Sequence, residues 1–127
     1  MDFSFSYDEQ RILLMITQSH YWSLDTFLRY KQEFLAVHEK IRTRRRHYRV
    51  FADCTDYPVQ SNEVVEAFAG FFNTLMNENK GHYAIIAGST LNKMQVQRVI
   101  PQSNVKVFTD RDAAMAWLFE PGSLPNM

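Results

Sequence analysis

A strand, a polar loop and an apolar helix follow one another between residues 48 and 76, and this unit constrains the fold more than any other stretch. The predicted strand runs from Tyr48 to Cys54, and apolar residues at helical spacing continue to Met76. Ser61 stands where the helix begins, and a serine oxygen there can accept hydrogen bonds from the open backbone N–H groups of the first turn. A strand that leads into an amphipathic helix is the repeating unit of α/β proteins.

The rest of the chain predicts further strands and helices around this unit. Alternating apolar residues and helical spacing predict a hairpin over 3–7 and 11–17, a helix over 24–41 capped by Ser23, a strand over 82–87, a short helix from 90 to about 100, a strand over 105–108, and a closing helix that ends before Pro121. Right-handed crossovers between strands favour a parallel arrangement after the hairpin. We therefore predict a single α/β domain over residues 1–127.

Two local features make further predictions about the helices. Gly70 lies in the middle of the central helix, where glycine costs up to ~1 kcal/mol relative to alanine. We therefore expect a close backbone contact or a bend at Gly70. Thr109 and Asp112 have the spacing of a capping box, which predicts that Thr109 caps the closing helix.

Composition narrows the class of protein. The chain has 127 residues, 46% of them hydrophobic, which is enough for one sizeable core. Lys+Arg and Asp+Glu each number 14, so the formal net charge of zero implies no general attraction to polyanions. Cys54 is the only cysteine, which is typical of a reducing compartment. We expect no membrane span, because no apolar run is long enough, and no signal peptide, and we predict a cytoplasmic protein of bacterial type.

The closing segment resembles a known family. Residues 107–118 read Val-Phe-Thr-Asp-Arg-Asp-Ala-Ala-Met-Ala-Trp-Leu, and Asp53 stands near the end of the central strand. With the order of elements, these features resemble the SpoIIAA-like group of small bacterial proteins, which is related in fold to STAS domains and is often named with the SEC14-like lipid carriers. The resemblance covers nearly the whole chain. It implies a mixed sheet of about five strands with four helices, and it implies no enzymatic activity.

Ser61 is the residue at which this resemblance suggests a switch. Anti-sigma-factor antagonists carry an Asp-Ser-Ser-Gly-type turn at the start of the second helix, where a serine is phosphorylated. The matching turn here reads Gln60-Ser61-Asn62-Glu63, in which only the serine agrees. We favour a helix cap over a phosphorylation switch at Ser61.

Residues with catalytic or metal-binding chemistry are scattered. No two of the four histidines have zinc-ligand spacing with each other or with Cys54, which we interpret as a packing residue. We therefore predict no metal, no cofactor and no enzyme. Asp53 and Asp56 follow a strand at the edge where α/β proteins bind ligands, so they form a candidate loop site, although ordinary turn chemistry explains Asp56 as well.

Five arginines between residues 42 and 49 form the one strong charge feature. Such a run can grip the phosphate groups of nucleic acid or lipid. In a chain of zero net charge it is more often a solvated connection. We predict no specific binding to nucleic acid.

The strands also suggest a second apolar face. One set of alternating positions holds Ile12, Leu14, Val50, Ala52, Val105 and Val107, and the opposite set holds Leu13, Met15, Phe51, Tyr83, Ile85 and Phe108. The second set predicts a homodimer interface or an apolar ligand site around Met15, Phe51, Tyr83 and Phe108. A helix that covers this face is an alternative of equal weight.

Two functions stay open at this point. The fold implied by the resemblance favours a non-enzymatic STAS-like regulatory module whose partner is a protein. The surplus of aromatic residues favours a carrier or sensor of a small apolar, lipid-like molecule. The sequence contains no paired acid and base, metal-binding or nucleotide-binding motif that would indicate an enzyme.

Overall fold

The structure, a computed structural model, describes residues 2–125, which contain five strands and four helices. In chain order these are β1 (Phe3–Asp8), β2 (Leu13–Gln18), α1 (Leu24–Arg42), β3 (Arg49–Cys54), α2 (Asn62–Glu78), β4 (Tyr83–Ala87), α3 (Thr90–Val99), β5 (Val105–Phe108) and α4 (Arg111–Leu118). The predicted central unit is therefore present as β3 and α2. Among the described residues, no helix combines the length and hydrophobicity that crossing a membrane requires.

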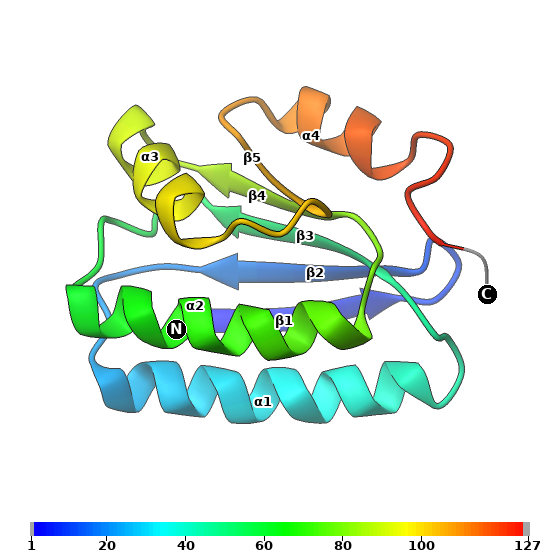
Figure 1. The fold of residues 1–127 in the computed structure, drawn as a ribbon, viewed down its shortest axis with the longest axis horizontal. Coiled ribbons are helices and arrows are strands. Elements are labelled where there is room, and N and C mark those ends of the chain that lie inside the picture. The colour runs from blue at the N-terminus through cyan, green and yellow to red at the C-terminus, as the bar shows by residue number, and fades with distance from the viewer. Residues whose placement is uncertain (1, 126–127) are drawn as a thin grey trace.

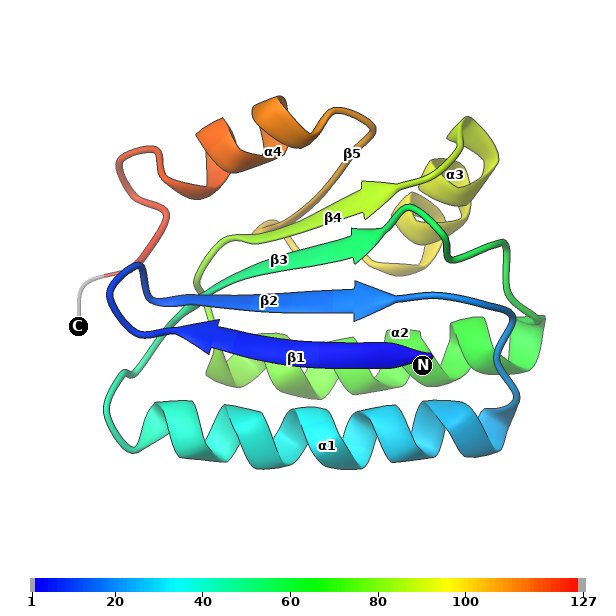
Figure 2. The same cartoon turned by 180° about the vertical axis from the view of Figure 1, so that it is seen from behind.

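The strands form one sheet in the order β1-β2-β3-β4-β5 (Figure 1). β1 pairs antiparallel with β2, and each later pair is parallel. The helices α1 and α2 lie side by side against one face, while α4 lies on the other, as the view from behind also shows (Figure 2). The predicted α/β class, with its mixed sheet of five strands and four helices, is confirmed.

Side-chain caps define where the helices begin. Ser23, Ser61 and Ser89 each accept a hydrogen bond from the backbone N–H three residues further on, which satisfies one open donor of the first turn. The predictions for Ser23 and Ser61 as caps are confirmed. The prediction for the closing helix is wrong by one residue, because Asp110 rather than Thr109 accepts from the first turn of α4.

The larger core lies between the sheet and the pair α1 and α2. Aromatic rings from both helices meet there at close range: the Phe27 and Phe68 centroids are 4.8 Å apart, and those of Phe34 and Phe71 are 5.5 Å apart. Such tilted and edge-on pairs contribute about 0.5–1.5 kcal/mol beyond the burial of their area. These contacts pack α1 against α2 and help to position α2 on the sheet.

The smaller core lies under α4. Its buried residues are Leu13, Phe51, Ala84, Ile86, Ala114 and Leu118, and Met15, Phe108, Met115 and Trp117 pack around them. Phe51 pairs with Ala84 across β3 and β4, so Ala84 and Ile86 share its face. The predicted grouping of Tyr83 and Ile85 with Phe51 is therefore wrong, because both belong to the larger core on the opposite face. The alternative prediction, in which a helix covers this face, is the one that the structure shows.

Two backbone positions depart from the expectations. The second strand begins at Leu13 rather than Arg11, because Ile12 adopts a positive φ of 50° in the preceding turn. Gly70 has no close contact, since a Cβ added there would meet nothing within 4 Å. Close packing at Gly70 is thus ruled out as the reason for a glycine in α2.

Candidate functional site

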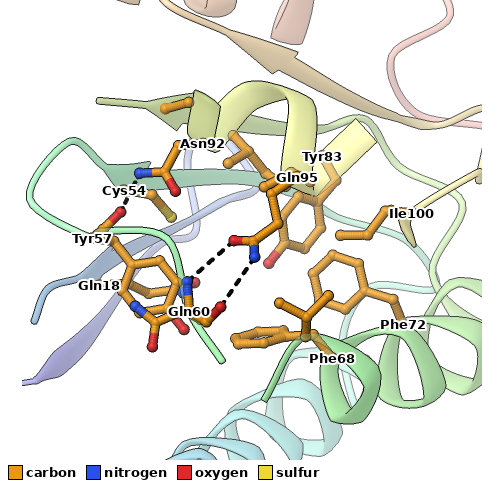
Figure 3. Close-up of a pocket in the computed structure, with 14 residues that line it drawn as sticks. Gln18, Cys54, Tyr57, Gln60, Phe68, Phe72, Tyr83, Asn92, Gln95 and Ile100 are labelled. Atoms are coloured by element: carbon orange, nitrogen blue, oxygen red, sulfur yellow. Dashed lines mark hydrogen bonds between the residues drawn. The ribbon is translucent and has the colours of Figure 1, made fainter. Parts of the chain in front are cut away.

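A cavity opens at the carboxyl edge of the sheet, where β2, β3 and β4 end (Figure 3). The loop after β3, the first half of α2 and the inner side of α3 close around it. The cavity has a volume of about 60 Å³. The carboxyl edge of parallel strands is the place where open α/β sheets most often bind ligands.

Most of the cavity wall is apolar. Tyr83, Ile85 and Ala87 of β4 form its floor, and Phe68 and Phe72 of α2 form one side. The floor residues are buried because they belong to the larger core. The cavity is thus a gap at the end of that core rather than a groove on the surface.

Amide side chains hold α3 against the loop after β3. The Gln95 side chain accepts from the backbone N–H of Gln60 at 3.2 Å and donates to the Gln60 carbonyl at 3.1 Å. Asn92 donates to the backbone carbonyl of Tyr57. Three hydrogen bonds therefore close the cavity on the α3 side.

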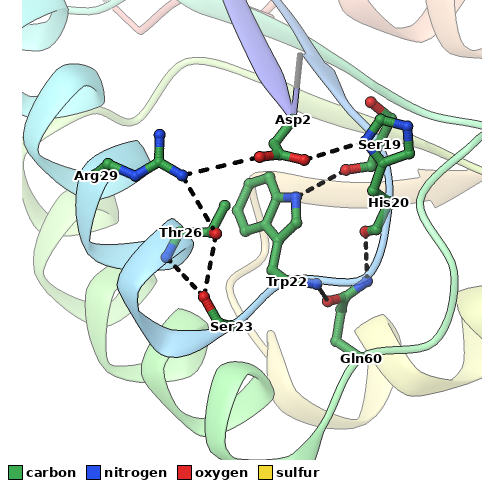
Figure 4. Close-up of polar contacts among 8 residues, drawn as sticks. All are labelled: Asp2, Ser19, His20, Trp22, Ser23, Thr26, Arg29 and Gln60. Atoms are coloured by element: carbon green, nitrogen blue, oxygen red, sulfur yellow. Dashed lines mark hydrogen bonds and ion pairs between the residues drawn. The ribbon is translucent and has the colours of Figure 1, made fainter.

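Gln60 also connects this loop to the segment before α1 (Figure 4). Its Oε1 accepts from the Trp22 backbone N–H at 2.7 Å, and its Nε2 donates to the carbonyls of His20 and Pro58 at 3.1 and 2.7 Å. Trp22 is anchored in turn, because its indole N–H donates to Ser19 at 2.8 Å. Gln60, which directly precedes Ser61, therefore joins the loop after β3 to the segment before α1 through its side-chain hydrogen bonds.

Two tyrosine hydroxyls in the cavity wall have no hydrogen-bond partner within the described residues. They belong to Tyr57, in the loop, and to Tyr83, which is fully buried on β4. Burial raises the pKa of both phenols, and it also raises the pKa of the Cys54 thiol beside them. All three groups are therefore neutral at physiological pH.

No acidic or basic side chain lines this cavity among the described residues. Nor do any three histidine, cysteine, aspartate or glutamate side chains come together there or elsewhere in that range as a metal site would require. The arrangement can hold an uncharged apolar molecule and can donate hydrogen bonds to it. Its own groups offer neither a base nor a nucleophile that is activated at neutral pH.

The predicted loop site is not part of this cavity. Asp53 lies on the α4 face, where its Oδ2 is 3.7 Å from Arg111 and its Oδ1 accepts two hydrogen bonds from Thr55. Asp56 is exposed, and its backbone carbonyl accepts from His20. The Asp53 side chain thus stabilises the turn after β3, while the backbone of Asp56 links that turn to the segment before α1.

The predicted apolar face is divided between the two sides of the sheet. Met15, Phe51 and Phe108 lie under α4, whereas Tyr83 lines the cavity on the other side. Phe51 is fully buried and has the Arg111 guanidinium 4.7 Å above its ring. A homodimer therefore finds no exposed surface at Phe51 in the folded chain, and oligomerisation elsewhere stays a prediction.

Several of the arginines between residues 42 and 49 have partners within the protein. Arg45 Nε is 2.9 Å from Glu9, and Arg42 is 3.9 Å from Glu78. Arg49 donates to the carbonyl of Leu118 and the hydroxyl of Ser123, which ties the segment after α4 to the start of β3. These contacts agree with the interpretation of the run as a structural connection.

The comparisons with known proteins concern the fold. No protein-family model matches the chain, and no curated protein matches it. Among solved structures, the chain is similar to the crystal structure of an uncharacterized protein from the DUF3478 family with a SpoIIAA-like fold, from Shewanella loihica PV-4. The two superimpose with a TM-score of 0.63 over 91% of each chain, at 15% sequence identity. The predicted SpoIIAA-like fold is thereby confirmed.

Proposed function

We propose that this protein is a non-enzymatic STAS-like module that binds a small, mainly apolar molecule at the carboxyl edge of its sheet, as a sensor or carrier. The observation that carries this proposal is the cavity between β4, α2 and α3, whose apolar wall contains two buried hydroxyls without partners. Buried polar groups in folded proteins are nearly always hydrogen-bonded, so these two hydroxyls can donate hydrogen bonds to a molecule in the cavity.

The closure of the cavity supports a binding role. Ligand sites are concave, mainly apolar and provided with a few polar groups, and this cavity shares that character although its volume is small. The helix α3 is held by hydrogen bonds of the Asn92 and Gln95 side chains and by the partly buried Val96, which packs against the larger core. A displacement of α3 would admit a molecule larger than the cavity.

Binding can be tested by titrating the ¹⁵N-labelled protein with acetophenone and ethylbenzene, and with 2-octanone as an aliphatic probe. We expect amide shifts confined to the cavity residues and dissociation constants of about 1 mM, the range expected of such small fragments. Ala87→Leu adds a side chain to the cavity floor and should abolish binding, whereas Ala113→Leu, on the exposed side of α4, should leave it unchanged. Absence of binding by all three probes, or binding that Ala87→Leu leaves intact, would contradict the proposal.

A second candidate function, a protein-interaction module, is favoured by the surface around the cavity. The described range has six exposed large hydrophobic residues, and four of them are Tyr21, Val59, Leu91 and Met94. In the sequence each of these four directly precedes a residue whose hydrogen bonds surround the cavity, namely Trp22, Gln60, Asn92 and Gln95. Leu91 and Met94 lie on α3, the element that closes the cavity. Occupation of the cavity would then change the surface presented to a partner, which is how a sensor reports its ligand.

The partner that can be tested directly is a second copy of the chain. Light scattering over a range of concentrations should show a dimer if the exposed residues of α3 form a homodimer contact. Leu91→Asp should then weaken the dimer, while Leu28→Asp, at another exposed apolar position on α1, should not. A wild-type chain that stays monomeric at high concentration would exclude the homodimer and leave the ligand proposal untouched.

A further inference from the structure

Resting on the proposed function, we infer that the ligand is an uncharged molecule with a hydrogen-bond acceptor of the carbonyl type, which the hydroxyls of Tyr57 and Tyr83 hold at the inner end of the cavity. Both residues line the same cavity, and both hydroxyls are buried without a partner in the described part of the chain. A phenol that is cut off from water loses the hydrogen bonds of its O–H group unless an acceptor replaces them.

The three glutamine side chains that line the cavity already accept hydrogen bonds from within the protein. The oxygen of Gln18 accepts from Tyr30, that of Gln60 accepts from Trp22, and that of Gln95 accepts from the Gln60 N–H. The three amide oxygens that line the cavity from glutamine residues are therefore engaged. Two O–H donors remain, so the complementary ligand is one that accepts hydrogen bonds.

The same wall argues against a charged ligand. The lining contains no cationic side chain, and burial keeps the phenols and the Cys54 thiol protonated. A carboxylate or phosphate would lose its hydration at the inner end of the cavity without a counter-charge to replace it. A ketone, ester or amide oxygen carries no such penalty and accepts up to two hydrogen bonds.

The dimensions suggest how such a molecule would lie. The cavity volume of about 60 Å³ is well below the ~150 Å³ at which an apolar cavity holds a benzene ring. It fits a small polar head, or about two water molecules at ~30 Å³ each when the ligand is absent. The apolar part of the ligand would then lie against Phe68 and Phe72 (Figure 3).

The test compares probes of one shape that differ in a single group: acetophenone, ethylbenzene and benzoate. Two hydrogen bonds at the usual net strength predict that acetophenone binds about five- to 150-fold more tightly than ethylbenzene. Benzoate should bind at least tenfold more weakly than acetophenone, and octanoate likewise relative to 2-octanone. The bound acetophenone should also show its carbonyl stretch at a lower frequency than in hexane, because it accepts hydrogen bonds.

Variants assign the effect to the two hydroxyls. Tyr57→Phe and Tyr83→Phe should each weaken acetophenone binding about three- to tenfold and leave ethylbenzene binding within twofold. Tyr7→Phe is the matched control, because Tyr7 also has a buried hydroxyl without a partner but lines a different concavity. Equal binding of acetophenone and ethylbenzene, or tightest binding of benzoate, would overturn this inference while the proposed function stands. Failure of every probe to bind would overturn both.

Discussion

Two tyrosines in the same core, Tyr30 and Tyr83, allow a direct test of the unpaired hydroxyls in the ligand-free protein. Both are fully buried. The Tyr30 hydroxyl donates to Gln18 Oε1 at 3.1 Å, whereas the Tyr83 hydroxyl has no partner among the described residues. Tyr30 lies near enough to influence the pKa of Tyr83, but the two hydroxyls do not have the geometry of a hydrogen bond. The same substitution, Tyr→Phe, should therefore have different effects at the two positions.

The expected magnitudes follow from these contacts. Tyr30→Phe leaves the buried oxygen of Gln18 without its donor, which should lower the free energy of unfolding by about 1–3 kcal/mol. Tyr83→Phe removes a buried hydroxyl that makes no hydrogen bond in the folded state. The free energy of unfolding should therefore stay unchanged or rise by up to ~1 kcal/mol. Each kcal/mol corresponds to about 3–5 °C in melting temperature for a chain of this length.

Urea denaturation of the wild type and both variants, after removal of bound small molecules by unfolding and refolding, measures the difference. Equal slopes against urea would show that the midpoints report stability alone. If Tyr83→Phe destabilises the protein as much as Tyr30→Phe does, the Tyr83 hydroxyl has a partner in the folded state. The argument for a ligand acceptor at Tyr83 would then fail.

Four further substitutions test other parts of the structure. Gly70→Ala should raise the free energy of unfolding by about 0.5–1 kcal/mol in a urea titration, because Gly70 lies in an open helical position. Gly81→Ala should lower it, because the new Cβ would clash with the backbone oxygen of Tyr48. A loss of stability in Gly70→Ala would contradict the open position. Burial and nearby basic side chains lower the pKa of His47 below 6.5. The free energy of unfolding should therefore be highest above pH 6.5 and fall as the pH drops towards 5, by at most about 1.4 kcal/mol per pH unit. His47→Gln should flatten this slope in melts recorded between those pH values, and an unchanged slope would exclude His47 as its source. Phe51→Glu should unfold the chain, as circular dichroism would show, and a folded variant would mean that α4 does not cover this position tightly.

Several elements were predictable because their signals are local. The caps at Ser23 and Ser61 depend on one side chain and the backbone N–H groups of the next turn, so the residue type and its place before an apolar stripe suffice. The parallel strands after the hairpin follow from the alternation of strands and helices. The closing helix was predicted, but its cap was misplaced by one residue, because Thr109 and Asp110 are both acceptable caps and the surrounding backbone decides between them.

The assignment of faces in β4 required the tertiary structure. All five residues from Tyr83 to Ala87 are buried, since helices cover both sides of the sheet there. A strand buried on both faces shows no alternation of polar and apolar residues, so its sequence does not reveal which side chains point to which face. The pairing of Phe51 with Ala84 settles that question and places Tyr83 in the cavity wall.

The cavity itself was also beyond sequence reasoning. Its polar contacts join residues about 35 positions apart, as between Gln60 and Gln95 or Tyr57 and Asn92, and an amide side chain carries no mark of so distant a partner. The sequence determined the elements and their order, because helical and strand periodicity are properties of neighbouring residues. The gap between β4, α2 and α3 was decided only when the sheet brought those elements together, because a cavity exists where packing between distant segments is incomplete.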